Sequence, residues 1–283
     1  MITSALIAQC RREFHDQPKT TRKLRDGDGS STVFNLGDFP IIEGSLSVYV
    51  ADVAKTETTD YSIDLDNGDL VFVSAPASGA EVRAEFKYAH WRDTQWNEAQ
   101  NQAIEELNGR GFFRQVVRTS GLVALSAGVR KYNAPSACID VYEIFKPDNS
   151  LSTGNYSLLN DNWNYQQDSN TIVTGSKPGA ASPLEISYLR RMQTYSATSA
   201  TLDTKDDWRE LIKKRAGSIF YRSLAGKVAK EGNASIDEGH FSFSNLKSEA
   251  DSYFSEFDTM AIRSKPTRPA KNIQWNIPGG RPA

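Results

Sequence analysis

The sequence has little cysteine and histidine, the residues from which disulfide frameworks and many metal sites are built. Its 283 residues include two cysteines, Cys10 and Cys138, and three histidines, His15, His90 and His240. Two cysteines are too few for a disulfide scaffold or a thiolate metal site, and we expect both to be packed inside the fold. The histidines lie far apart and form no paired metal-binding motif, so we expect them at the surface or at helix ends. The sequence therefore predicts no metal site and no redox centre.

Long hydrophobic runs and a strong excess of one charge are also lacking. No stretch approaches the roughly 18 apolar residues of a membrane span, and the N-terminus reaches Arg11 and Arg12 before any long apolar run. With 33 basic and 35 acidic residues the formal net charge is −2, which excludes a polycation that coats nucleic acid. Because 39% of the residues are hydrophobic and 24% are charged, we expect a soluble globular protein without an export signal, in one or two domains.

Motifs that would indicate an enzyme are missing. Gly226-Lys227 lacks the upstream glycine of a phosphate-binding loop, and no G-x-S-x-G sequence marks a nucleophilic serine. The acidic segment 64–69 is similar to a calcium loop, but Gly68 stands at the fifth position instead of the sixth, and Ala75 stands where a glutamate is required. Asn67-Gly68 favours instead a tight hairpin turn with positive φ at both residues. We therefore expect no catalytic residues and no cofactor.

Apolar residues at helical spacing predict four helices. Leu6, Cys10 and Phe14 share one face of the first helix, while Arg11 points elsewhere. The predicted helices cover residues 2–15, 91–108, about 204–228 and 244–263. The polar segment 19–31 follows the first helix and has the composition of a mobile loop, so we interpret it as a linker.

Short alternating runs rich in Val, Tyr and Phe predict antiparallel strands in two regions, 32–88 and about 116–192. The first region has the strand lengths and turn spacing of a small sandwich. The predicted fold class is α+β: a helical bundle with an antiparallel β region, an inserted small β-sandwich and an extended C-terminal tail. The corresponding segments are an N-terminal helix and linker (1–31), the inserted module (32–90), a core of helices and β region (91–263) and the tail (264–283).

The tail differs from the rest of the chain in charge. Residues 263–283 carry five basic residues and no acid, which leaves residues 1–262 with a net charge of −7. Trp275 lies between Ile273 and Ile277, so the three could present one apolar edge to a partner. A solvated end without a partner is the alternative interpretation.

The order of these signals over residues 96–226 resembles the adaptor, or head-completion, proteins beneath the portal of tailed bacteriophages. The resemblance rests on four segments: a helix ending in Leu107–Phe113, Tyr132–Pro135 before Ile139–Tyr142, Leu184–Arg191, and Trp208–Ala216. The module is similar to small sandwiches of phage particle proteins, through Asp60–Ile63, Asn67–Phe72 and Ala75–Ala80. Met192 departs from the family pattern, because a proline often follows this strand. Minimal adaptors also lack the module.

The resemblance implies a structural virion protein at the head-to-tail interface, assembled in the host cytoplasm. In such proteins the subunits form a ring, commonly of twelve copies, that binds the portal, receives the next neck or tail protein and lets double-stranded DNA pass without specific binding. The C-terminal segment reaches the portal, and the tail of this chain is similar to it in position and character. The residues expected to bind the portal are Arg268, Lys271, Ile273, Trp275, Ile277 and Arg281.

Two other functions remain open from the sequence. The chain could be a tail-fibre or receptor-binding module, in which Tyr49, Tyr61 and Tyr88 form the binding face. The alternative for these tyrosines is packing in the core or at a sheet edge. An enzyme of unknown type is the second possibility, and a tightly bound metal or nucleotide would reveal it.

Overall fold

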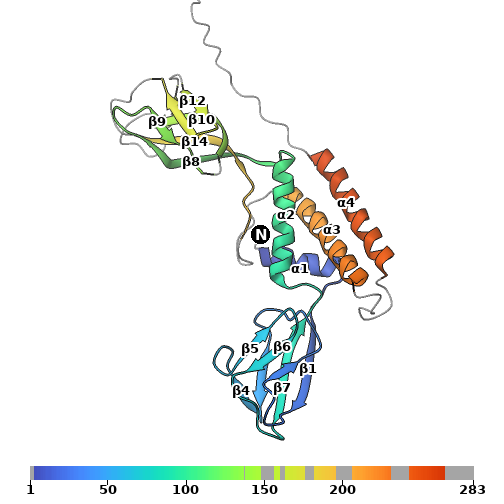
Figure 1. Cartoon of the computed structure of the whole chain (residues 1–283). Coiled ribbons are helices and arrows are strands. Elements are labelled where there is room, and N and C mark those ends of the chain that lie inside the picture. The colour runs from blue at the N-terminus through green and yellow to red at the C-terminus, as the bar shows by residue number, and fades with distance from the viewer. Residues whose placement is uncertain are drawn as a thin grey trace, which may run out of the picture. The chain divides into compact units, whose positions relative to one another are not determined.

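The computed structural model describes residues 3–136, 138–147, 156–159, 163–175, 182–195, 206–230 and 242–264 (Figure 1). The chain divides into two compact units, one built from residues 1–104 and 194–263 and the other from residues 105–193. Helices and antiparallel sheets occur together, which confirms the predicted α+β class.

The predicted helices are confirmed to within a few residues at each end. They are α1 (Thr3–Glu13), α2 (Asp93–Gly109), α3 (Asp206–Lys230) and α4 (Phe243–Ser264). Leu6 and Cys10 on α1 and Phe14 directly after it are buried as expected. The prediction that Arg11 points away from the buried face is wrong, because its side chain is buried as well.

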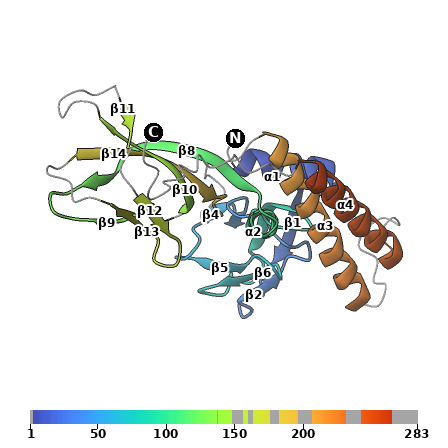
Figure 2. The same cartoon turned by 90° about the horizontal axis from the view of Figure 1, so that it is seen from above.

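Helix α3 lies in the middle of the helical part of the first unit and is buried along most of its surface. Lys213 and Lys214 on α3 both pair with Glu13 of α1, at 2.7 and 3.0 Å between nitrogen and oxygen. Gly217 allows α1 to approach closely, because a Cβ there would lie 2.3 Å from the Phe14 ring. Helix α4 runs beside α3 (Figure 2), and Lys214 pairs with Glu256 at 2.9 Å.

The module consists of two small antiparallel sheets that enclose a common core. One sheet has the order β1-β7-β3-β4 and the other has the order β2-β6-β5. The strands are β1 (Lys19–Asp26), β2 (Val33–Asn35), β3 (Ser47–Val50), β4 (Val53–Lys55), β5 (Tyr61–Asp64), β6 (Asp69–Phe72) and β7 (Glu81–Tyr88). Alternate residues Val82, Ala84 and Phe86 of β7 are buried between the sheets, as the predicted sandwich requires.

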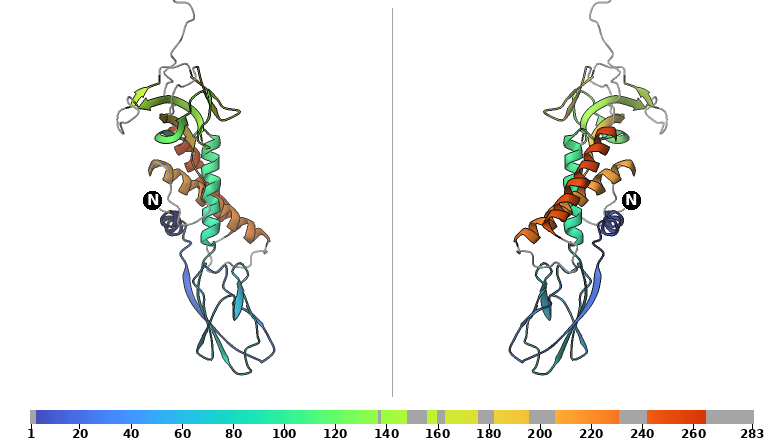
Figure 3. Two further views of the ribbon diagram at one scale, coloured as in Figure 1. Left: turned by 90° about the vertical axis from the view of Figure 1, so that its left-hand side faces the viewer. Right: turned by 90° about the vertical axis from the view of Figure 1, so that its right-hand side faces the viewer.

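The predicted linker is wrong for residues 19–26, which form β1. This strand pairs with β7 along its full length, from Lys19 opposite Tyr88 to Asp26 opposite Glu81. In Figure 3 the blue strand leaves the end of α1 and the cyan strand returns to the start of α2. The module therefore begins at Lys19, thirteen residues earlier than predicted.

The predicted hairpin between β5 and β6 is confirmed, but its turn differs from the expected two-residue type. Asp64 pairs with Asp69, so the loop has four residues, and Gly68 has a positive φ of 69° whereas Asn67 does not. The Asp64 carboxylate accepts hydrogen bonds from the backbone N–H groups of Asp66 and Asn67, at 2.9 and 3.2 Å. This carboxylate therefore stabilises the turn, as short polar side chains commonly do.

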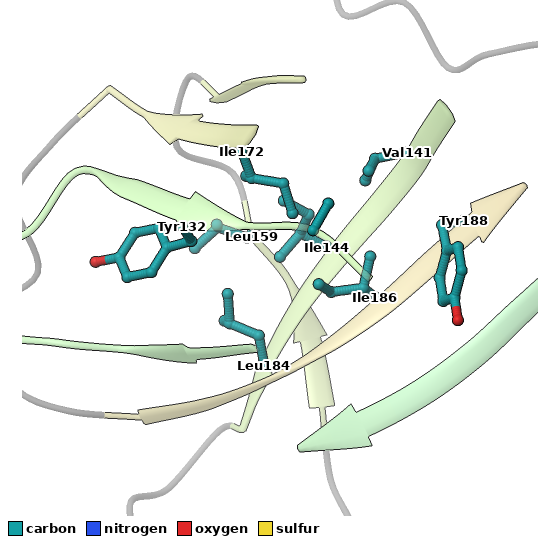
Figure 4. Packing of buried hydrophobic residues seen from close by; sticks show 9 residues of the cluster. Tyr132, Val141, Ile144, Leu159, Ile172, Leu184, Ile186 and Tyr188 are labelled. Atoms are coloured by element: carbon teal, nitrogen blue, oxygen red, sulfur yellow. The ribbon is translucent and has the colours of Figure 1, made fainter. Parts of the chain in front are cut away.

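The second unit contains the predicted second β region. One sheet has the order β11-β10-β14-β8, and a smaller one has the order β12-β13-β9. The strands are β8 (Phe113–Leu125), β9 (Lys131–Asn133), β10 (Cys138–Pro147), β11 (Tyr156–Leu158), β12 (Trp163–Gln166), β13 (Thr171–Thr174) and β14 (Ser182–Arg191). Ile144, Ile172 and Ile186 come from three of these strands and pack in one core (Figure 4).

Candidate functional site

The predicted portal-binding residues cannot be placed by the structure. Arg268, Lys271, Ile273, Trp275, Ile277 and Arg281 all lie outside the described residues. Their assignment stays a prediction from sequence.

The two cysteines have the packed surroundings that we expected. Cys10 is fully buried, and this burial raises the pKa of its thiol to about 12. Cys138 is half-buried beside Tyr165, and burial raises its pKa as well. Thiols of this kind are poor nucleophiles, because the thiolate is the reactive form.

The histidines are only partly where we expected them. His15 is exposed, as predicted, and His240 lies outside the described residues. His90 is half-buried, with its ring centroid 6.5 Å from that of Phe220, and burial lowers its pKa. Within the part of the chain that the structure describes, no group of three His, Cys, Asp or Glu residues could hold a metal ion.

A group of charged and aromatic residues joins the module to the helices. The chain enters the module after α1 and leaves it before α2, and six residues meet where these two connections lie together. We call them the module anchor: Arg11, Asp16, His90, Trp91, Asp93 and Trp96.

Arg11 is the donor at the centre of the module anchor and is only 5% exposed. Its Nη1 donates to Oδ2 and to the backbone oxygen of Asp16, at 2.9 and 3.0 Å. Its Nη2 donates to the Trp91 backbone oxygen at 2.8 Å and to Asp93 Oδ1 at 2.9 Å. One guanidinium therefore holds the chain after α1, the chain after β7 and the first residue of α2 together.

Asp16 is the acceptor at the centre of the module anchor and is 1% exposed. Besides Arg11, it accepts hydrogen bonds from Trp96 Nε1 and from the His90 backbone N–H, both at 2.7 Å. Burial raises the pKa of this carboxyl to about 6, although the Arg11 charge and these hydrogen bonds oppose the rise. The loss of the favourable hydration of the ion thus outweighs the attraction of its partners.

Aromatic rings pack around the buried ion pair. Trp96 stacks on Phe14 and on Phe220, with centroid distances of 5.8 and 4.8 Å. Trp91 contacts Phe220 edge to face at 5.1 Å. Such pairs add stability beyond their buried area and exclude water from the ion pair.

A second set of ion pairs holds the end of the module that lies next to α2. Arg92 donates through Nε and Nη2 to both carboxylate oxygens of Asp66, at 3.0 and 2.9 Å. It also pairs with Glu43 at 3.3 Å, and Thr94 donates to the same Glu43 oxygen at 3.0 Å. The hairpin loop between β5 and β6 is thereby held to the start of α2.

Asparagine side chains on α2 make a different kind of junction with the chain that follows β14. Asn108 bonds Met192 reciprocally: its Nδ2 donates to the Met192 oxygen and its Oδ1 accepts from the Met192 N–H, both at 2.9 Å. Asn101 bonds Tyr195 in the same way, at 2.6 and 2.9 Å. The N–H that Met192 supplies is one that proline lacks, so the departure from the family pattern has a structural role here.

The tyrosines proposed as a receptor-binding face have packing roles. Tyr61 is buried in the module core, and Tyr88 packs against that core. The Tyr49 ring lies under the Arg83 guanidinium at 4.4 Å. These placements favour packing over a shared binding face.

Sequence reasoning missed the module anchor entirely. Arg11 was expected off the apolar face, and Asp16 was not selected as a site residue. Their partners lie about 80 residues away. The one available signal was the pair of tryptophans, because a buried indole N–H needs an acceptor.

The module anchor and the asparagine junctions fix chain segments to α2 through ion pairs and hydrogen bonds. Among the described helices, none combines the length and apolar character that crossing a bilayer requires.

Residues 78–264, about two thirds of the chain, match the family described as SU10 adaptor protein. No curated protein matches the sequence. The matched range begins just before β7 and ends with α4, so it contains the last strand of the module, α2 to α4 and the second β region. The chain therefore belongs to the SU10 adaptor protein family, and it is a structural adaptor of a tailed bacteriophage.

Proposed function

We propose that this adaptor forms a ring below the portal, completes the DNA-filled head and provides the docking site for neck and tail proteins. The observation that carries the proposal is the family match over residues 78–264, since an adaptor family implies interaction with other phage head and tail proteins. Copies of one chain that contact each other head to tail close into a ring when the rotation between them allows it. A ring of about twelve copies follows from the resemblance described above.

The proposed role needs no catalysis and no cofactor. A ring that conducts double-stranded DNA should not hold its phosphates, because each neutralised phosphate adds salt-dependent affinity. The net charge of −7 on residues 1–262 fits such a channel. In this proposal the protein is a component of the virion at the head-tail interface.

The basic tail is proposed to bind the portal, through Arg268, Lys271, Ile273, Trp275, Ile277 and Arg281. Support for this comes from sequence alone: five positive charges without an acid, and three apolar residues at alternate positions. A segment with this composition gains order when it binds a partner.

Co-sedimentation with portal particles tests this proposal. We expect deletion of residues 265–283 to leave a folded subunit, judged by circular dichroism, that no longer joins the portal. A full-length Trp275→Ala variant should bind about tenfold or more weakly, since aromatic anchors carry much of an interface's energy. Undiminished portal binding by the deletion variant would overturn the assignment of the tail.

A further inference from the structure

The module carries a net negative charge and an exposed apolar patch. Its residues 19–88 contain twelve acidic and seven basic residues, and all seven basic ones lie in strands of the β1-β7-β3-β4 sheet. On the outer side of the β2-β6-β5 sheet, Val33, Val71 and Val73 are 57%, 37% and 70% exposed. We call these three residues the valine patch.

The valines of the patch lie side by side. Val33 of β2 is directly opposite Val71 of β6, and Val73 follows two residues later, on the same side of the strand. Cross-strand pairs of this kind stabilise a sheet by contacting each other, while their outer surface here is exposed. Within the described residues no other element covers them, so the patch has the character of a contact surface.

Strand β2 offers a backbone edge beside the patch. It lies at the end of its sheet, next to β6 only (Figure 2). The Thr32 oxygen accepts from Phe72 and the Leu36 N–H donates to Gly68, so the even-numbered residues face β6. The backbone groups of Val33 and Asn35 therefore face away from the sheet, where a further strand could pair with them.

The chain itself contains a segment with the complementary chemistry. Residues 263–283 carry five positive charges and no acid, and they place Ile273, Trp275 and Ile277 at alternate positions. An extended strand beside β2 would present these three side chains on one face, in line with the valine patch. Its basic residues would meet the acidic surface of the module.

We propose that the edge of β2 and the valine patch bind the C-terminal segment, residues 265–283, of a second copy of this chain. The segment would bind as a strand added to the edge of the sheet. Main-chain hydrogen bonds would provide the affinity, and contacts of its alternate apolar residues with the valine patch would set the register. This surface is separate from the proposed portal contact. Because one segment cannot occupy both places, the module of a neighbour and the portal would compete for it.

The direction of α4 favours a segment from another copy. Helix α4 is antiparallel to α3, because Arg222 pairs with Asp251 while Lys214 pairs with Glu256. The module meets α3 near Phe220, and the adjacent Tyr221 stacks on Tyr253 of α4, so Ser264 lies about eleven helix residues, or roughly 17 Å, beyond that level.

The remaining distance takes up nearly the whole reach of the tail within one copy. The valine patch lies about three strand residues, or roughly 10 Å, further along the module from the loop at Gly68. The nine Cα–Cα steps from Ser264 to Ile273 span at most about 32 Å when fully extended, against a separation of roughly 27 Å. Binding to the same copy would therefore require residues 265–273 to run back along the helices almost fully extended, which favours a neighbouring copy in the proposed ring as the source of the segment.

The test is a binding measurement with a labelled peptide of residues 265–283, in the absence of portal. The acceptor is the full chain with Ile273→Ala and Trp275→Ala, whose own tail is weakened. We expect saturable binding that falls at least about tenfold when Val33→Lys and Val71→Lys are added. Val53→Lys is the matched control, because Val53 is 60% exposed on β4 of the other sheet and should not change the affinity.

A peptide of the same composition in scrambled order separates strand pairing from simple charge attraction. We expect it to bind at least about tenfold more weakly at about 150 mM salt, where long-range attraction is screened. Equal binding of the scrambled peptide, an affinity that is unchanged by the two lysines, or an equal loss with Val53→Lys would each overturn the proposal.

A mixing experiment distinguishes a second copy from the same copy. One full-length variant carries Ile273→Ala and Trp275→Ala, and the other carries Val33→Lys and Val71→Lys. If the segment binds in trans, the native chain self-associates in sedimentation velocity, each variant does so more weakly, and an equimolar mixture regains part of the association. A native chain that associates no more than the variants, or no gain on mixing, would overturn the assignment to a second copy. Portal co-sedimentation by the Val33→Lys, Val71→Lys variant reports separately on the proposed function.

Discussion

The two β regions of this adaptor are joined to their helices by opposite chemistry. The module depends on a buried ion pair, Arg11 with Asp16, packed among aromatic rings. The chain that returns from the second β region is held by uncharged amide groups, as in the pair of bonds between Asn108 and Met192. A buried charge is costly unless its partner remains, whereas a neutral amide loses little more than its own bonds. Removing one partner from the first junction should therefore lower the free energy of unfolding more than a similar change in the second. The contribution of the first junction should also depend on pH.

The largest effect is expected from Arg11→Met, which breaks the charged junction and leaves Asp16 buried without its partner. Loss of one member of a buried ion pair costs about 3–5 kcal/mol. We expect a decrease of this size in the free energy of unfolding at pH 7, measured by urea denaturation. Arg12→Met at the exposed neighbouring position should change stability by less than about 0.5 kcal/mol. Similar effects of the two substitutions would contradict the role given to Arg11.

The pH dependence of stability should come next in size. The pKa of Asp16 is about 6 in the folded protein and 3.8 as its ordinary value, so the folded state holds this proton more tightly. Between about pH 4 and pH 6 the folded protein is protonated at Asp16 while the unfolded chain is not, and stability falls as pH rises. The shift corresponds to about 3 kcal/mol over this range.

Asp16→Asn is the variant that isolates this contribution. The difference in unfolding free energy between the native chain and the variant should change across pH 4 to 6 and be flat above pH 7. The same difference for Asn108→Ala should stay constant over the whole range, because no ionisable group is removed. A flat profile for Asp16→Asn would show that the carboxyl titrates near its ordinary pKa.

The smallest expected effect concerns the neutral junction. Met192→Pro removes the N–H that donates to Asn108, leaving its Oδ1 without that donor, at a cost of about 1–3 kcal/mol. Met192→Leu keeps the N–H and a side chain of similar volume, so it should cost less than about 1.5 kcal/mol. Differential scanning calorimetry can compare the two, and equal melting temperatures would remove the role given to the N–H.

The sequence predicted those parts of the fold in which burial follows the local period. Helix α2 repeats apolar residues at helical spacing, and β7 alternates buried and exposed residues, so both were found. Strand β1 was missed because its inward positions are Thr21 and Lys23, and Lys23 is held there by Asp38 at 2.6 Å. An inward-facing polar residue that is paired with a distant residue does not produce the alternating pattern from which a strand is predicted.

In the candidate site, too, only the residues with a local sequence signal were predicted. The charge and alternation of the tail are local properties, so its residues were selected from sequence alone. Asp16 and Trp96 are distant in sequence and join only through folding, so no pattern within either segment could pair them. Met192 was noted as a departure from the family, but only the structure supplied the reason, which is its N–H.

The order of strands in the module has a consequence for how the protein is made. Strand β7 lies inside its sheet, between β1 and β3, yet it is the last strand of the module to be synthesised. The strands before β7 leave the ribosome before β7 exists, and β1 cannot pair along its full length until the chain has been synthesised past Tyr88. Such non-local pairing delays folding and keeps strand edges open in the meantime. The polar residues of β1, which prevented its prediction as a strand, keep the edge of the unpaired β1 soluble.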